Sequence, residues 1–119
     1  MDVLEATADN IPEIAKLFVL YRQFYECKPD IKLAEKYISE RILNEESTIF
    51  IANDNGTIRG FVQMYPSFCS VDAIKIFILY DLYVNASDRN SGIGSLLMNK
   101  AAEHAKKQGA SRIDLMTAS

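Results

Sequence analysis

An apolar strand that runs through a glycine-containing loop straight into a helical pattern constrains this chain more than any other feature. The strand covers about residues 71–84, the loop holds the spaced pair Gly92 and Gly94, and helical spacing follows at once. Such a loop leaves several backbone N–H groups unpaired at the start of a helix. Together with the helix dipole, these groups attract phosphate oxygens. We therefore expect a strand–loop–helix unit with an anion site in the loop.

The first 43 residues have the spacing of a short strand followed by two helices. Residues 3–6 are the strand candidate. Apolar residues recur at three- and four-residue spacing from Asn10 to about Tyr25, and Asn10 with Glu13 resembles a capping box. A second amphipathic helix restarts after Asp30 and carries Ile31, Ala34, Ile38 and Ile42.

The pattern then changes to the period of strands. Residues 48–52 and 57–65 flank an Asn-Gly turn at 53–56, which predicts a hairpin whose second strand ends at Pro66. The strand 71–84 is apolar on both faces and should be central in the sheet, with Tyr80 on one face and Phe77, Leu79 and Tyr83 on the other. A third helix is expected over 92–108, capped by Gly109, and a last strand over 112–117.

Composition excludes several classes of protein. The net charge is −3 and no Lys/Arg-rich run occurs, so nothing points to nucleic acid. No stretch approaches the roughly 18 apolar residues of a membrane span, and residues 1–5 do not resemble a secretory signal. Cys27 and Cys69 lack metal-ligand spacing, and a lone His104 beside an apolar stripe is expected to be structural. We expect one α+β (α/β) domain over 1–119, no metal, reduced thiols and a cytoplasmic location.

The element order β-α-α-β-β-β-α-β and the loop together resemble the GNAT superfamily of acetyl-CoA-dependent N-acetyltransferases. Arg89, Gly92 and Gly94 match its signature Arg/Gln-x-x-Gly-x-Gly/Ala directly after the fourth strand. The run 60–68 is similar to a subgroup related to histone and polyamine acetyltransferases. The resemblance covers essentially the whole chain and implies a mixed, mostly antiparallel sheet with helices on both faces.

The resemblance also implies a co-substrate and a reaction. Acetyl-CoA would donate its acetyl group to a primary amine, such as a small-molecule amine, a polyamine or a lysine side chain, by direct attack. The pantetheine arm would pair with the main chain of Leu82, Tyr83 and Val84, where an N–H group would stabilise the oxyanion. The N–H groups that would hold the pyrophosphate belong to the loop residues Arg89, Asn90, Ser91, Gly92, Ile93, Gly94 and Ser95.

Asp81 is the candidate general base, because an amine must lose its proton before it attacks. The alternative is a strand-end carboxylate that hydrogen-bonds a neighbouring loop. Tyr80 and Tyr83 are candidates for the acid that protonates the leaving thiolate, or else core residues. Glu26, Asp30 and Glu35 either draw in a cationic amine or form a solvated helix face.

In the family the fold continues past the fifth strand with a helix and two more strands, which usually supply a catalytic tyrosine. The C-terminally incomplete fold leaves three hypotheses for this chain. It is an N-acetyltransferase completed by further residues or a second subunit, a non-catalytic CoA-binding module, or an interaction protein that dimerises. An unpaired edge at the fifth strand would favour a homo-oligomer.

Overall fold

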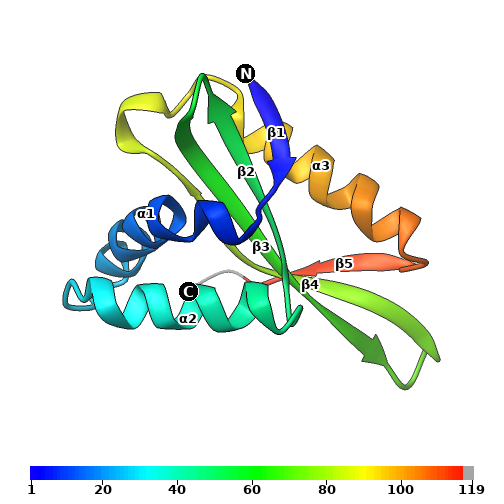
Figure 1. Ribbon diagram of the computed structural model, residues 1–119. Coiled ribbons are helices and arrows are strands. Elements are labelled where there is room, and N and C mark those ends of the chain that lie inside the picture. Colours follow the sequence, from blue (N-terminus) through cyan, green and yellow to red (C-terminus); the bar gives the residue numbers. More distant parts are fainter. Residues whose placement is uncertain (117–119) are drawn as a thin grey trace.

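The computed structural model describes residues 1–116 and has the element order expected from the sequence. Two short 3-10 turns, η1 and η2, precede helices α1 and α3 (Figure 1). The bounds are β1 Asp2–Glu5, η1 Ala8–Asn10, α1 Ile11–Phe24, α2 Ile31–Leu43, β2 Thr48–Asp54, β3 Thr57–Cys69, β4 Ile74–Val84, η2 Ala86–Asp88, α3 Ile93–Lys107 and β5 Arg112–Leu115. Thr117, the expected end of the last strand, lies outside the described residues.

The five strands of the described residues form one sheet in the order β1-β2-β3-β4-β5. The first three pairings are antiparallel and β5 runs parallel to β4, so the expected mixed, mostly antiparallel sheet is confirmed. Helices α1 and α2 cover one face and α3 covers the other (Figure 1). Each face has its own buried core, around Phe61 on the α1/α2 side and around Leu97 on the α3 side.

Local signals set most helix ends. Asp30 caps α2 by accepting a hydrogen bond from the Leu33 N–H at 3.0 Å. Gly109 ends α3 with a φ of 82°. The expected capping box at the start of α1 is wrong, because Asn10 Oδ1 accepts from the Thr7 N–H at 2.9 Å. It therefore closes the box of the preceding turn, whose N-cap is Thr7.

The hairpin between β2 and β3 is confirmed. Asn55 and Gly56 both have positive φ, 50° and 90°, which is the backbone of a type I′ turn.

Pro66 does not end β3, which continues to Cys69. The pairing of β2 with β3 stops at Met64, so among residues 1–116 the part of β3 beyond Met64 pairs with β4 alone. Pro66 therefore lies where β3 has a free side, and its missing N–H breaks no ladder bond.

A β-bulge in β4 changes which residues share a face. Gln63 pairs with Asp81 and Met64 pairs with Leu79, so Tyr80 is the extra residue. As a result Phe77 and Leu79 pack on the α3 side while Tyr83 packs on the α1/α2 side, and the expected common face of these three is wrong. The strand also starts at Ile74 rather than residue 71, since the Ala73 N–H closes a turn onto the Ser70 carbonyl at 3.2 Å.

Gly60 is needed where β3 and β4 approach closely. A Cβ at Gly60 would lie 2.8 Å from the Tyr83 carbonyl oxygen and 3.3 Å from the Val84 Cα. Both neighbours are backbone of the paired strand and cannot move without shifting β4. We expect Gly60→Ala to lower the free energy of unfolding by about 1–3 kcal/mol, measured by urea denaturation.

Gly94→Ala is the matched control for that measurement. A Cβ at Gly94 meets nothing within 4 Å, and its φ is not in the left-handed region. Ala is a better helix former than Gly, so this variant should be as stable as the original or more so. Equal losses in the two variants would show that the contact with β4 is not what requires glycine at position 60.

Candidate active site

The loop between β4 and α3 presents a set of unpaired backbone donors. Gly92 is the N-cap of α3 and has a left-handed φ of 86°. The hydrogen bonds of residues 1–116 include none donated by a backbone N–H group between Arg89 and Ser95. These groups lie at the positive end of a 15-residue helix. The anion site expected from the sequence therefore has its donors free.

Side chains around the loop hold it against the end of β4. The Arg89 Nε donates to the Val84 carbonyl at 3.1 Å, and its guanidinium lies 5.3 Å from the centre of the Tyr83 ring. The Ser91 hydroxyl donates to the Asp88 carbonyl. The Asp88 carboxylate in turn faces the Arg59 guanidinium at 3.5 Å. Arg89 thus lies along the end of β4 while remaining an exposed residue.

The last part of β4 has a free outer edge. β5 pairs with β4 only from Ile76 to Leu79, and the Met116 N–H adds one more bond to the Leu79 carbonyl at 3.0 Å. Beyond Leu79, the pairing of β4 within residues 1–116 is with β3 alone. Apart from the Val84 carbonyl, which accepts from Arg89, the outer edge of residues 82–84 is therefore open to an added strand-like ligand.

A row of three neighbouring cavities, called the groove below, follows this edge from the loop toward Asp81. Their volumes are about 210, 220 and 260 Å³. The first, beside Arg89, shares Tyr21, Tyr25 and Leu82 with the middle one. The middle cavity shares Tyr80 with the third, which contains Asp81. The loop and the acidic residue are thus two ends of one surface feature.

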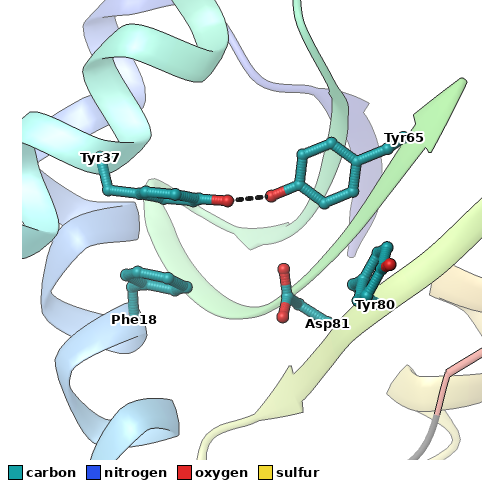
Figure 2. Close-up of a pocket in the computed structure, with 5 residues that line it drawn as sticks. All are labelled: Phe18, Tyr37, Tyr65, Tyr80 and Asp81. Atoms are coloured by element: carbon teal, nitrogen blue, oxygen red, sulfur yellow. Dashed lines mark hydrogen bonds between the residues drawn. The ribbon is translucent and has the colours of Figure 1, made fainter.

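The third cavity is an aromatic box around a carboxylate (Figure 2). Its lining comes from α1, α2, β3 and β4, and consists of Phe18, Tyr37, Tyr65, Tyr80 and Asp81. The Phe18 and Tyr37 rings stack with centres 5.5 Å apart, and Tyr65 meets Tyr80 edge-on at 5.3 Å. The hydroxyls of Tyr37 and Tyr65 are hydrogen-bonded to each other (Figure 2).

Burial raises the pKa of Asp81 above its ordinary value of 3.8. Two neighbouring donors, the Gln63 amide and the Tyr21 hydroxyl, oppose this rise in pKa by stabilising the ionised form. The Gln63 Nε2 lies 2.7 Å from the Asp81 Oδ2. A half-buried carboxyl with a raised pKa beside a cavity fits proton transfer from a bound group.

Burial also keeps the tyrosines around Asp81 in their protonated form. The pKa of Tyr21 is raised far above its ordinary value of 10.0, first by burial and then by the negative charge of Asp81. The pKa of Tyr65 is raised likewise by burial and by its hydrogen bond with Tyr37. Both phenols therefore remain neutral hydrogen-bond donors throughout the physiological pH range.

Comparison with known proteins decides the family. A profile of the acetyltransferase (GNAT) family matches residues 13–119. The chain belongs to the GNAT family. Its relative in Bacillus subtilis (strain 168), named uncharacterized N-acetyltransferase YhfO, is 39% identical over 117 residues, which is 98% of this chain and 78% of the relative. The chain is therefore an acyltransferase by family.

Solved GNAT structures agree with this fold. The crystal structure of a probable acetyltransferase has a TM-score of 0.93 and 31% identity, covering 99% of this chain and 80% of that one. An aminoglycoside acetyltransferase from an uncultured soil metagenomic sample, in complex with sisomicin, has a TM-score of 0.79 and 16% identity. It covers 98% of this chain and 77% of that one, and at this identity it supports the fold alone.

The GNAT site residues expected from the sequence fall into two groups along the groove. Leu82, Tyr83, Val84 and Arg89 line the cavity next to the loop, and Asp81 lies at the far end. Tyr80 is not a core residue, since it is 43% exposed and lines two of the cavities. The bulge explains this placement, because it puts Tyr80 and Asp81 on the same cavity instead of on opposite faces.

Sequence reasoning missed the partners of Asp81. Phe18, Tyr37 and Tyr65 come from three other elements, and no local pattern marks them as neighbours. Gln63 did carry a signal, because it is a polar residue inside an otherwise apolar strand. His104 lies on the opposite side of the sheet, with its ring edge-on to Phe50 and Phe77.

Two further searches of the described residues bear on alternative functions. Within residues 1–116, no three or more His, Cys, Asp or Glu side chains are grouped so as to hold a metal ion. No helix in that part of the chain is long and apolar enough to cross a membrane.

Proposed function

We propose that this GNAT chain transfers the acetyl group of acetyl-CoA to a primary amine by direct attack. The N–H groups of residues 89–95 would hold the pyrophosphate, and the free main chain of Leu82, Tyr83 and Val84 would pair with the pantetheine arm. Asp81 would take the proton of the amine. The observation that carries the proposal is the row of neighbouring cavities that extends from Arg89, beside the unpaired loop amides, to Asp81.

The proposed chemistry needs three proton and electron-pair movements. The bound ammonium gives a proton to the Asp81 carboxylate and becomes a neutral amine. The amine nitrogen attacks the thioester carbonyl, whose oxyanion a β4 N–H group would stabilise. The nitrogen of the tetrahedral intermediate then loses its second proton as the C–S bond breaks, and the CoA thiolate takes up a proton, so that the net reaction leaves one proton on Asp81. Of the two tyrosines considered as donors, we favour Tyr80, because it lines both the middle cavity and the cavity of Asp81.

The aromatic box favours a cationic amine as acceptor. Rings of Phe18, Tyr37, Tyr65 and Tyr80 surround one carboxylate, an arrangement that attracts ammonium groups through charge and cation–π contacts. Glu26, Asp30 and Glu35 are exposed and are not among the residues that line the groove. The preference for a cation therefore rests on Asp81 and the rings, not on the acidic helix surface.

An acceptor panel tests this function. Thiol release from acetyl-CoA would be followed with polyamines, a lysine peptide, an aminoglycoside and amino acids as acceptors, and with neutral primary amides as the negative control. We expect kcat/KM to be at least about tenfold higher for amines that carry a second positive charge than for amino acids that carry a carboxylate, the factor expected from about 1.4 kcal/mol of differential attraction.

Calorimetry with acetyl-CoA separates the alternatives. Binding without thiol release from any amine would favour the non-catalytic CoA-binding module. Absence of binding would contradict both readings and leave an interaction protein. Equal turnover of all amines would remove the preference for a cation but not the transferase activity. The homodimer through β5 and the cytoplasmic location remain predictions, and sedimentation of the purified chain would test the first.

A further inference from the structure

The buried side of Asp81 contains an amide that the reaction itself does not use. Among residues 1–116, Gln63 is the polar side chain in the buried set, with 0% of its surface exposed. A buried amide is destabilising unless both of its ends are hydrogen-bonded. Here both ends are bonded, since the Ser47 hydroxyl donates to Oε1 at 2.7 Å and Nε2 donates to the Asp81 Oδ2 at 2.7 Å. Three side chains thus form one hydrogen-bonded row from the start of β2 across β3 to β4.

The row fixes which end of the amide faces the carboxylate. An ionised carboxyl accepts hydrogen bonds only, so it needs the NH₂ end of Gln63. The hydroxyl of Ser47 satisfies the carbonyl end as a donor. A glutamine amide has no proton to give up at these pH values, so it orients Asp81 rather than relaying a proton.

The position of Gln63 matters because Asp81 sits next to the bulge. Gln63 and Asp81 are register partners, and the register shifts directly beyond them. A strand residue beside a bulge has fewer ladder neighbours to hold its side chain. The amide of Gln63 replaces that constraint from the buried side of the sheet.

We propose, on the basis of the function proposed above, that Gln63 is a positioning residue for the general base. Its amide holds Oδ2 of Asp81, so that the other oxygen, Oδ1, receives the proton of the acceptor amine. Ser47 holds the other end of the amide.

The titratable groups around Asp81 set the expected pH effect. Tyr21 faces it from α1, Tyr37 from α2, Tyr65 from β3, and Tyr80 precedes it in β4. The Arg41 guanidinium lies 4.4 Å from the centre of the Tyr37 ring. Since the Gln63 hydrogen bond lowers the pKa of Asp81, its loss must raise that pKa further. The acid limb of kcat/KM against pH would then move to higher pH.

The test compares Gln63→Met with Met64→Leu. Met has nearly the length of Gln but no donor, and Met64 is the next residue of β3, fully buried on the opposite face. We expect Gln63→Met to move the acid limb upward by about one pH unit, with about a tenfold lower kcat/KM below that limb. Met64→Leu should change stability without moving the limb.

Carbon NMR of the labelled Asp81 carboxyl, in the absence of substrate, gives a second readout that does not need activity. The same upward shift in the carboxyl titration would support the positioning role even if the purified chain transferred no acetyl group. Gln63→Glu serves if the Met variant does not fold, because two carboxyls at this distance share a proton and also move the limb upward. An unmoved limb together with an unmoved titration in a folded variant would overturn the inference.

Discussion

Replacement of Asp81 by Asn should lower kcat by about 10²- to 10⁴-fold, the usual contribution of a positioned general base. The amide keeps the size of the side chain and can still contact Gln63, but it cannot accept a proton from the amine. The affinity for acetyl-CoA should stay within about twofold, because the loop amides are at the other end of the groove. Steady-state kinetics with a saturating polyamine and calorimetry with CoA would measure the two effects separately.

The same variant should be more stable than the original at neutral pH. Burial raises the pKa of Asp81 in the folded protein, so the folded state keeps its proton to higher pH than the unfolded chain does. The stability from this group is present at low pH and is lost as the pH rises from about 3.8 through the folded-state pKa. The asparagine side chain of the variant carries no charge to desolvate. The gain in stability should therefore appear only at pH values above that range.

Asp72→Asn is the control, because Asp72 is a surface carboxylate paired with Arg112 at 2.8 Å and is remote from the groove. Its replacement should leave kcat unchanged. Full activity of Asp81→Asn would assign the proton transfer to another group and leave Asp81 with the structural role considered from the sequence.

Replacement of Gly94 by Leu should weaken the binding of coenzyme A by about 10²- to 10⁴-fold. A pyrophosphate seated on the unpaired amides would lose at least two charge-assisted hydrogen bonds, each contributing about 1.5–3 kcal/mol. The fold should tolerate the change, since a Cβ at Gly94 meets nothing within 4 Å and Leu is a better helix former than Gly. Calorimetry with CoA and a thermal melt would report the two quantities.

Asn99→Leu is the matched control, because Asn99 is an exposed residue of the same helix, beyond its first turn. Gly92 is less suitable for this test, since its φ of 86° would strain any replacement and could disturb the turn itself. Unchanged affinity in Gly94→Leu would mean that the phosphates do not rest on the start of α3.

The sequence determined the features that depend on near neighbours along the chain. The spacing of apolar residues predicted all three helices, because a helix buries one side at every third or fourth residue. Asn55-Gly56 predicted the hairpin, since few other pairs accept two positive φ values. Gly92 and Gly94 behind a buried strand predicted the free amides at the start of α3, and the same segment pointed to Asp81.

Only the tertiary structure decided the features that depend on contacts between distant segments. Pro66 is acceptable inside β3 because β2 begins opposite Met64 and does not extend alongside Pro66. The bulge at Tyr80 results from the pairing of two strands, and it brings adjacent residues onto one cavity. The donors that lower the pKa of Asp81 belong to Gln63 and Tyr21, which are far from it in sequence. Local patterns fix the elements, but the pKa of a carboxyl depends on what the fold packs around it.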